Sequence, residues 1–505
     1  MTRRYLSRSL LVFPLLLALG CRAPFEAVGV TPPPPPPPTS ILPMRIGAAG
    51  PDFARAVATD FAGNAYVASY FSGTVDFDAG PGVTAKTAIG PYDIALAKYA
   101  ADGTFQWVFT TGGSDVDVPF DVKLAPDGGI YLTGYTTSGA LCNGQQIQNA
   151  GSRDILLMRI SPAGTCDWAI SVGSTADDEG HALAIDANGD VLVTGTFAGT
   201  VDFDPGPGTG ILISRGGTDA FVARYTANGT FVSVAQFGGL GDDAGNAIAL
   251  RPDGDVMVAG TFSGTATFGS VLAPQLLLSA GGLDFFLARM SPSLGLEWAV
   301  RGGGAGDDIV GPGGIAVTAA GTTFVAGSFT GTTNVAPGEG APLLISHGDA
   351  DVFVANFDAS GMWASFARSF GGTGTESVAS LAQDVSGNLY LSGSFQGTVD
   401  FDPGTRATVV TSLSTSPAAD AYVLSLNQAG DLRWVDRIGA VISGDGFVAI
   451  ANGLSLSPDG SLWAVGRFFG LADLDPGTGS ANKQSLGDAD QFIVRYNPVT
   501  GALQH

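Results

Sequence analysis

Basic side chains, histidine and cysteine are scarce in this sequence, and each scarcity argues against a class of function. There are three His and three Cys in 505 residues, and the His residues do not cluster with the spacing of metal ligands. Lys and Arg number 23 against 46 Asp and Glu, so the formal net charge is −23. We expect no nucleic-acid binding, because phosphate contacts need clustered Lys and Arg. The charge favours cations, basic partners or simple solubility.

The sequence also lacks any helix signal. Gly is abundant instead, at 74 residues, and it punctuates short runs of Val, Ile, Phe, Tyr, Thr and Ala. Such runs, separated by Gly-containing turns, are typical of many short strands joined by hairpins. Helical and membrane-spanning architectures are therefore not expected beyond the N-terminus.

The N-terminal 40 residues indicate the subcellular location of the protein. Residues 1–20 combine three Arg with a short apolar run, as in an export signal, and Leu17-Ala-Leu-Gly-Cys21 resembles a bacterial lipobox. The resemblance implies lipidation of Cys21; an ordinary signal peptide is the alternative. Residues 21–40 hold seven consecutive Pro, 32–38, which form a polyproline II spacer of roughly 20 Å. We expect an exported bacterial lipoprotein, bound to the outer membrane or cell surface through its lipid.

One unit recurs seven times after this spacer. An Asp opens the third strand of each copy: Asp93, Asp154, Asp219, Asp284, Asp351, Asp420 and Asp490. A basic residue follows five positions later in five copies, with Asn356 and Ser425 in the others, and four copies carry a Trp in the fourth strand. Turn pairs such as Gly63-Asn64 and Asn188-Gly189 supply the conformation that tight hairpins need.

Four antiparallel strands per copy predict an all-β fold, a seven-bladed β-propeller over residues 41–505. A parallel β-solenoid is the alternative, although hairpin turns inside each unit argue against it. The seventh copy runs out at His505, before its fourth strand, while residues 42–47 look like a fourth strand. We therefore predict that this N-terminal strand closes the last blade, which removes exposed edges.

The repeats resemble the bacterial SBBP β-propeller repeat family. Its units carry an Asp-x-x-Gly-Asn turn, as in 60–64 and 384–388, and an Asp-Ala-Phe-Val strand, as in 219–222. The fifth copy departs most, since 318–321 reads Thr-Ala-Ala-Gly. The resemblance implies a propeller in an exported bacterial protein and no defined reaction.

Acidic residues concentrate in the connections at one end of the strands. The clearest pattern is Asp-x-Asp, in which two carboxylates share one side of a strand while the intervening residue faces the core. Two interpretations stay open: these residues hold Ca²⁺ together with turn carbonyls, or they cap turns and solvate an edge. The candidate ligands are Asp76, Asp78, Asp202, Asp204, Asp400, Asp402, Asp473 and Asp475.

Signals for catalysis are weak. His181 lies in the first strand of the third copy and could face the channel, but a structural role is the better interpretation. Cys142 and Cys166 fall at opposite ends of strands in the second copy. A strand length of about 17 Å would separate them, so we predict no disulfide between them unless a loop folds down the edge.

The favoured hypothesis is a monomeric surface module that binds a protein, glycan or cation, without catalysis. The alternative is an exported propeller-type hydrolase or lyase with a carboxylate-lined site near the channel. Converging carboxylates with a His or Arg at the channel mouth would favour the enzyme. Departures from the repeat, in copies two and five, are where a unique site is expected.

Overall fold

The structure is a computed structural model that describes residues 41–270, 273–404, 406–414, 418–440, 449–475 and 480–505. The predicted signal peptide, Cys21 and the Pro-rich spacer lie outside these residues. Every regular element in the described ranges is a strand, and none of them contains a helix long and apolar enough to cross a membrane.

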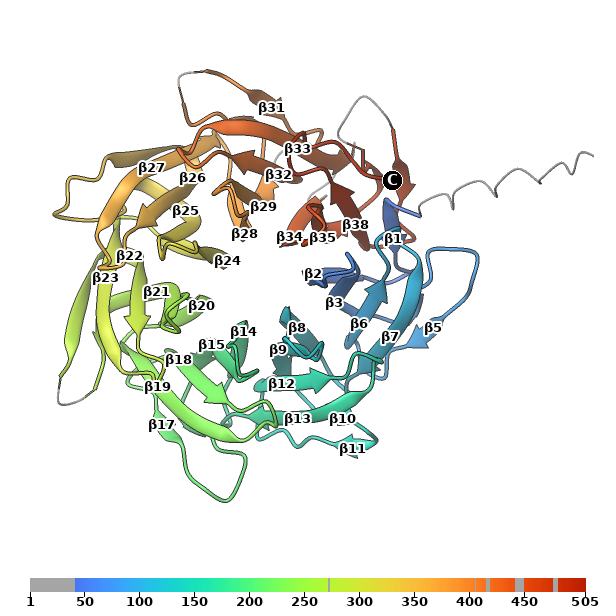
Figure 1. The fold of residues 1–505 in the computed structure, drawn as a ribbon, viewed down its shortest axis with the longest axis horizontal. Helices are drawn as coiled ribbons and strands as arrows, with labels where there is room; N and C mark the ends of the chain where they lie inside the picture. The colour runs from blue at the N-terminus through green and yellow to red at the C-terminus, as the bar shows by residue number, and fades with distance from the viewer. Residues whose placement is uncertain (1–40, 271–272, 405, 415–417, 441–448, 476–479) are drawn as a thin grey trace, which may run out of the picture. The chain divides into compact units, whose positions relative to one another are not determined.

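Sheets of antiparallel strands stand side by side around a central opening (Figure 1). The first three repeats contribute β2 (Phe53–Thr59), β3 (Ala65–Phe71), β6 (Asp93–Tyr99) and β7 (Phe105–Thr111); β8 (Asp117–Leu124), β9 (Ile130–Thr136), β12 (Asp154–Ile160) and β13 (Cys166–Val172); and β14 (Glu179–Ile185), β15 (Val191–Phe197), β18 (Asp219–Tyr225) and β19 (Phe231–Gly239). Within each repeat the strands pair in chain order, and the first strand lies beside the opening (Figure 1).

The remaining repeats have the same order of pairing. They contribute β20 (Ala244–Leu250), β21 (Val256–Phe268), β22 (Gln275–Met290) and β23 (Leu296–Gly304); β24 (Asp308–Val317), β25 (Thr323–Asn334), β26 (Leu343–Phe357) and β27 (Trp363–Gly372); β28 (Ser377–Gln383), β29 (Leu389–Phe395), β32 (Asp420–Leu426) and β33 (Leu432–Ala440); and β34 (Ala449–Leu456), β35 (Leu462–Phe468) and β38 (Asp490–Tyr496). Beside β38 lies β1 (Met44–Ile46), antiparallel, with Arg45 opposite Phe492.

Short outer hairpins connect the second and third strands of several repeats. They are β4 (Thr74–Asp76) with β5 (Ala85–Thr87), β10 (Leu141–Cys142) with β11 (Gln145–Gln146), β16 (Thr200–Asp202) with β17 (Ile211–Ile213), β30 (Thr398–Asp400) with β31 (Val409–Thr411), and β36 (Leu471–Asp473) with β37 (Asn482–Gln484). In repeats four and five the same hairpin is continuous with the long strands β21–β22 and β25–β26. The hairpins lie at the outside of the ring, far from the opening (Figure 1).

The turn between the first two strands follows from its sequence. In repeat one, one carboxylate oxygen of Asp60 accepts the backbone N–H groups of Ala62 and Asn64. Gly63 between them has φ of +79°, a conformation that side chains disfavour. The Asp-x-x-Gly-Asn pattern is therefore a local device that fixes the hairpin and its register.

The hydrophobic core lies between neighbouring sheets. One cluster joins Tyr131 and Ile155 of repeat two to Val193 and Phe221 of repeat three, all of them buried. The second and third strands are buried on both faces, so they read as near-continuous apolar runs. Each sheet thus depends on its neighbour for burial, as expected of stacked repeats.

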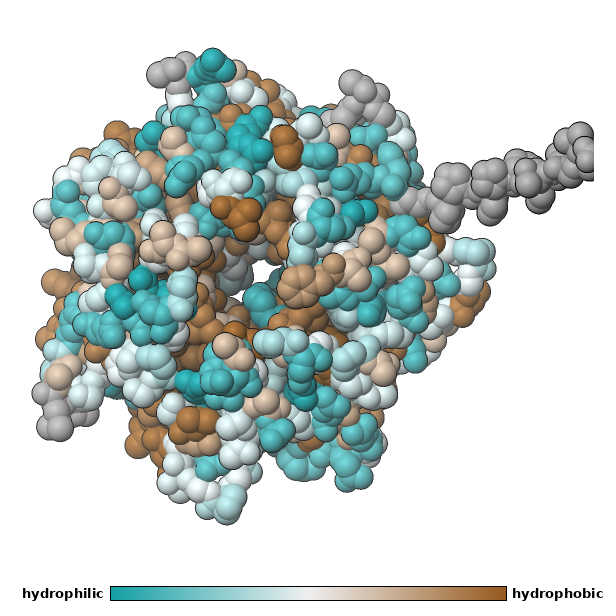
Figure 2. Space-filling model, in the orientation of Figure 1, coloured by the Kyte–Doolittle hydropathy of each residue, from teal (hydrophilic) through white to brown (hydrophobic). Residues whose placement is uncertain are grey.

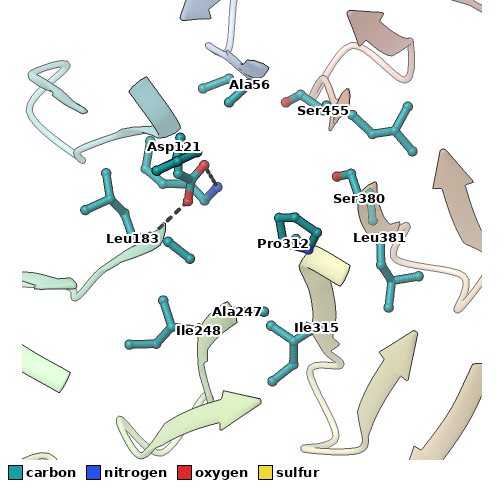
Figure 3. A pocket seen from close by; sticks show the side chains of 18 of the residues that line it. Ala56, Asp121, Leu183, Ala247, Ile248, Pro312, Ile315, Ser380, Leu381 and Ser455 are labelled. Carbon is teal, nitrogen blue, oxygen red and sulfur yellow. Dashed lines mark hydrogen bonds and ion pairs between the residues drawn. The ribbon is translucent and has the colours of Figure 1, made fainter. Parts of the chain in front are cut away.

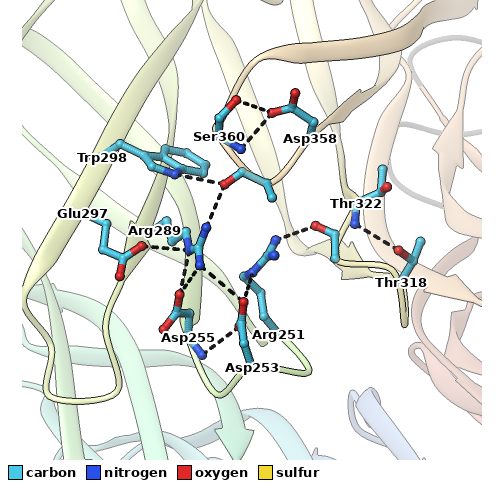
Figure 4. A network of polar contacts seen from close by, with 12 residues as sticks. Arg251, Asp253, Asp255, Arg289, Glu297, Trp298, Thr318, Thr322, Asp358 and Ser360 are labelled. Carbon is cyan, nitrogen blue, oxygen red and sulfur yellow. Dashed lines mark hydrogen bonds and ion pairs between the residues drawn. The ribbon is translucent and has the colours of Figure 1, made fainter.

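Hydrogen bonds and ion pairs join successive repeats near the turn between the first two strands (Figure 4). Arg289 is held by Asp255, with a 2.7 Å hydrogen bond, and donates to the carbonyl oxygen of Ala359 in the next repeat at 2.8 Å. Trp298 donates to the same carbonyl. The recurring Arg and Trp of the sequence therefore bind repeat to repeat.

The last repeat makes the corresponding contact with the first. Arg495 donates to the carbonyl oxygen of Ala101 at 3.1 Å, across 394 positions of sequence. In repeat six, where Ser425 stands in place of the Arg, Arg433 of the fourth strand donates to Ser425 at 2.7 Å and to the carbonyl of Pro498. A basic residue from another strand thus substitutes for the one that is missing.

The prediction that Cys142 and Cys166 remain unpaired is wrong. They form a disulfide with their Cα atoms 5.4 Å apart. The connection after β9 folds back along the outer edge of repeat two, where Asn143 donates to the carbonyl oxygen of Cys166 and Leu141 exchanges hydrogen bonds with Thr111. The distance argument failed because this loop does not stay at the end of the strands.

Candidate functional site

The predicted Asp-x-Asp residues lie in the outer hairpins and shape them. Asp76 accepts the backbone N–H groups of Asp78, at 3.1 Å, and Thr84, at 2.7 Å, and Asp78 accepts that of Gly80. The same pattern recurs at three further pairs, Asp202 and Asp204, Asp400 and Asp402, and Asp473 and Asp475. The intervening Phe77, Phe203, Phe401 and Leu474 are buried, as the strand period predicted.

The structure does not bring these pairs together. Each pair belongs to its own hairpin, and within the described ranges no group of three or more His, Cys, Asp or Glu side chains is arranged to hold a metal ion. Hydrogen bonding accounts for one oxygen of the carboxylates of Asp76, Asp78, Asp202, Asp204, Asp400, Asp402 and Asp473 as a turn acceptor. Calcium binding at these eight residues stays a prediction.

The Asp residues that open the third strands are buried, although their position at the ends of strands suggested a charged rim. Asp284, for example, is fully buried and accepts the backbone N–H of Ala280 at 2.7 Å. Acids before the first strands behave alike: Asp243 accepts from Gly239 and Ser263. Burial raises the pKa of Asp243 to about 6. These carboxylates hold loops in place and add little to the surface charge.

The central opening is a poor candidate for chemistry. Its cavity of about 470 Å³ is lined chiefly by small and apolar side chains, among them Ala56, Ala247, Leu183 and Leu381 (Figure 3). The carboxylate of Asp121 is engaged, since it accepts the backbone N–H of Leu183 at 2.9 Å and pairs with Lys123 at 2.6 Å. Apolar side chains are also prominent around the opening on the molecular surface (Figure 2).

A second cavity, of about 310 Å³, opens over repeats one and two and shares Arg55 and Phe120 with the channel. We call it the aromatic pocket. Its lining comprises Phe53, Tyr70, Tyr92, Phe120 and Tyr135 with Arg55, Arg153, Glu179, Val116 and Val118. The rings contact one another: the centroid of Tyr70 lies 4.9 Å from that of Phe53 and 5.4 Å from that of Tyr92.

Arg55 belongs to the lining that the aromatic pocket shares with the channel. Its guanidinium carbon lies 4.9 Å from the centre of the Phe120 ring, and among the described residues its guanidinium makes no hydrogen bond or ion pair. Burial lowers its pKa, while Tyr70, Tyr135 and Glu179 oppose that effect. Because an arginine remains charged in proteins, Arg55 is a partly buried cation whose guanidinium lies against an aromatic ring.

A series of charged groups in contact with one another also lines the pocket or lies beside it. Arg153 lies over the ring of Tyr135, 4.7 Å from its centre, and pairs with Glu179 at 2.5 Å. Glu179 also contacts Nε2 of His181 at 3.3 Å, and Nδ1 of His181 lies 3.1 Å from the carbonyl oxygen of Gly245. Burial raises the pKa of Glu179, but the contacts with His181 and Arg153 outweigh it and leave the pKa lowered.

The structural role expected of His181 is consistent with these contacts. The pairing of the first strand with the second skips His181, and it skips Asn246 and Asn452 in the same way in their repeats. We call this place in the first strand the bypassed position. Asn246 and Asn452 also donate to a carbonyl of the next repeat, at Val310 and Ala54. His181 thus joins two repeats while lining the mouth of the channel.

The aromatic pocket is local to one sector of the ring. At the bypassed position, Arg55 and Phe120 of repeats one and two correspond to Asn246 in repeat four and Ala379 in repeat six. At the end of the second strand, strand pairing aligns Tyr70 and Tyr135 with small polar or charged residues: Thr196, Thr261, Ser328, Ser394 and Arg467.

None of the residues that line this pocket was predicted from the sequence, although a departure from the repeat was expected in copy two. The signal was present: large aromatic and charged residues replace small ones at aligned positions in neighbouring copies. Copy five, the other expected departure, has its irregular first strand at Val310–Ile315 but no comparable group of rings there.

Comparisons with known proteins add little about the site. No family model matches the chain. It is 28% identical over 244 residues, 43% of its length, to the regulatory protein FlaEY of Caulobacter vibrioides, and 21% identical over 476 residues, 85% of its length, to the uncharacterized WD repeat-containing protein L264 of Acanthamoeba polyphaga mimivirus. The chain spans only 25% and 30% of these two proteins.

Among solved structures, a europium-containing methanol dehydrogenase aligns over 89% of this chain and 93% of its own, at 10% identity and a TM-score of 0.35. The rhamnogalacturonan lyase YesW aligns over 89% and 90%, at 12% identity and a TM-score of 0.27. Both scores are too low to transfer any function.

Proposed function

We propose that this protein is an exported, lipid-anchored binding module whose ligand enters the aromatic pocket. The observation that carries the proposal is Arg55, a partly buried cation without an ionic partner among the described residues, surrounded by aromatic rings in a cavity. Convergent polar groups in an otherwise apolar concavity are the usual signature of a ligand site. The resemblance to the SBBP repeat family is part of this proposal.

The same proposal includes a closed ring of seven blades, with β1 as the fourth strand of the last blade. Three contacts between the ends of the chain support it. Arg45 pairs with Asp490 at 2.7 Å, Asn452 donates to the carbonyl of Ala54, and Thr59 bonds Ser455. Closure would give the pocket a rigid frame, because no sheet edge is then left open.

Anchoring through Cys21 would place this frame at the bacterial surface, with the Pro-rich segment as a spacer. Support comes from the sequence pattern alone. Metabolic labelling with a palmitate analogue, followed by cell fractionation, tests it. We expect label in the membrane fraction for the parent protein and none for Cys21→Ala.

Calcium belongs to the proposal at the outer hairpins. The Oδ1 atoms of Asp202 and Asp204 accept backbone hydrogen bonds, whereas their Oδ2 atoms make none with the described residues. Two such oxygens with turn carbonyls and water would make a weak site, in the millimolar range of about 10⁻⁴–10⁻³ M seen for extracellular modules.

A propeller-type enzyme is the second candidate, and one observation favours it. Glu179 and His181 are in contact at the channel mouth, and Arg153 supports the carboxylate. A hydrolase or lyase could use such a pair as acid and base. Both ring nitrogens of His181 are engaged, however, and so binding fits these contacts better than proton transfer.

Binding by the mature protein to arrayed glycans and peptides tests the main proposal. We expect ligands whose binding is lost in Tyr92→Ala and retained in Ser394→Ala, which alters the corresponding sector of repeat six. Ligands retained equally by both variants would show that binding takes place elsewhere on the protein.

A further inference from the structure

The charge inside the aromatic pocket is opposite to that of the whole protein. Arg153 is neutralised by Glu179 at 2.5 Å, whereas Arg55 has no ionic partner among the described residues. Arg467 flanks the site from the preceding repeat, its guanidinium carbon 4.5 Å from the centre of the Phe53 ring. A chain of net charge −23 repels anions in general. Cations without an ionic partner among the described residues therefore favour, at this place, an anion that they can contact directly.

We propose that the aromatic pocket binds a sugar ring bearing a carboxylate, a hexuronate unit of an acidic polysaccharide, with the carboxylate on Arg55. The proposal rests on the binding function proposed above and names its ligand class. Its two parts, the carboxylate and the ring, have separate grounds.

The carboxylate follows from Arg55. The guanidinium carbon of Arg55 lies over the Phe120 ring, and the guanidinium N–H groups have no hydrogen-bond partner among the described residues. A carboxylate matches these groups with two parallel N–H···O bonds. A cationic ligand is disfavoured, because the same guanidinium would repel an ammonium group.

The proposal of a sugar ring rests on the aromatic side chains that line the pocket. Phe53, Tyr70 and Tyr92 form an aromatic cluster, with ring centroids 4.9 and 5.4 Å apart and neighbouring rings inclined at 58° and 88°. Aromatic faces carry partial negative charge and attract the weakly positive C–H groups of a pyranose ring. Ring hydroxyls need polar partners beside such a cluster, and Glu179 and Arg153 line the same pocket. The cavity of about 310 Å³ is at the small end of ligand sites, which suits one or two sugar units.

Calorimetry of the mature protein tests both parts. The ligands are a trimer of galacturonate, a disaccharide that contains glucuronate and a trimer of mannuronate, each as the free acid and as its methyl ester. We expect binding of at least one acid, with its methyl ester about 10- to 100-fold weaker, the loss expected for a charge-assisted bidentate contact. Arg55→Gln should weaken the acid by the same factor and leave the ester unchanged. Ala379→Gln, at the corresponding position of repeat six, should change neither.

Failures of the two proposals differ. If acid and ester bind equally and Tyr92→Ala removes both, the pocket is a binding site but the carboxylate is overturned. If none of the sugars binds while another ligand depends on Tyr92, the sugar is overturned and the binding function stands. If no ligand depends on Tyr92, Arg55 or Tyr70, both proposals fail. Thermal unfolding of each variant separates lost binding from lost folding, and Arg55→Lys, which keeps the charge without the fork, serves where Arg55→Gln does not fold.

Discussion

Arg55 and Phe120 occupy the same bypassed position in neighbouring repeats, and the cation of one lies 4.9 Å from the ring centre of the other. Elsewhere this position joins repeats by hydrogen bonds, as Asn452 does to Ala54 and His181 to Gly245. Between repeats one and two a cation–π contact stands in that place. The guanidinium N–H groups of Arg55 consequently have no hydrogen-bond partner among the described residues. This contact between two repeats is part of the lining of the aromatic pocket.

A double-mutant cycle on Arg55→Gln and Phe120→Leu measures the free energy of the cation–π contact between Arg55 and Phe120. We expect a coupling free energy of unfolding of about 0.5–2 kcal/mol, the range for cation–π pairs from exposed to desolvated. Denaturation of the four proteins gives it. Additive effects of the two substitutions would mean that the contact contributes nothing to stability.

Removal of residues 41–50 should lower the free energy of unfolding by roughly 5 kcal/mol or more. The deletion uncovers the edge of β38 and removes Met44 and Ile46, which are both 1% exposed, and large buried side chains contribute roughly 2–5 kcal/mol each. Deletion of Pro32–Pro38 is the matched control and should leave the melting temperature unchanged. A melting curve unaffected by the first deletion would remove β1 from the closed ring.

Stability should fall as pH rises from 5 to 8. Burial raises the pKa of six acids at the starts of first strands well above their usual range, to about 6 or 7: Asp52, Asp117, Asp178, Asp243, Asp308 and Glu376. A raised pKa in the folded state means that folding takes up protons between about pH 4 and 7, so stability is present at low pH and lost as pH passes through 6–7.

Melting temperatures measured between pH 4.5 and 8.5 test this dependence. Asp117→Asn keeps an acceptor for Gly113 and removes one titrating group, so its melting temperature should vary less with pH than that of the parent protein. A melting temperature that rises steadily from pH 5 to pH 8 in the parent would contradict the assignment.

Reduction of the Cys142–Cys166 disulfide should cost about 3 kcal/mol of stability, because the bond closes a loop with a sequence separation of 24. Unfolding with and without a thiol reductant measures the change, and Cys142→Ala with Cys166→Ala should reproduce it without reductant. Equal stability of all three preparations would show that the loop is held by its hydrogen bonds alone.

The strands could be predicted because their signals are local and repeated. Asp219, the apolar run after it and turns such as Asn188-Gly189 fix the third strand and the hairpin of each copy, and the strands lie where these patterns put them. The loop that carries Cys142 could not be predicted, because its path depends on contacts with Thr111 and Cys166 in other strands.

The site escaped prediction for the opposite reason. Shared residues such as Asp284 attract attention in a repeat protein, yet they are buried and hold loops. The proposed function rests instead on residues that the repeats do not share: Tyr70, Tyr92 and Arg55 come from distant parts of one repeat and meet only when the sheet is folded. Their aligned counterparts in repeat four are Thr261, Leu283 and Asn246, and strand register, which sequence alone leaves open, is needed to align them.

A crystal structure of the mature protein soaked with the tightest-binding acidic oligosaccharide tests the central claim most directly. We predict density for a sugar ring against Tyr70 and Tyr92, with its carboxylate in hydrogen-bond contact with the guanidinium of Arg55. Density for the ligand at the outer hairpins or in the central channel, with the aromatic pocket empty, would contradict the account.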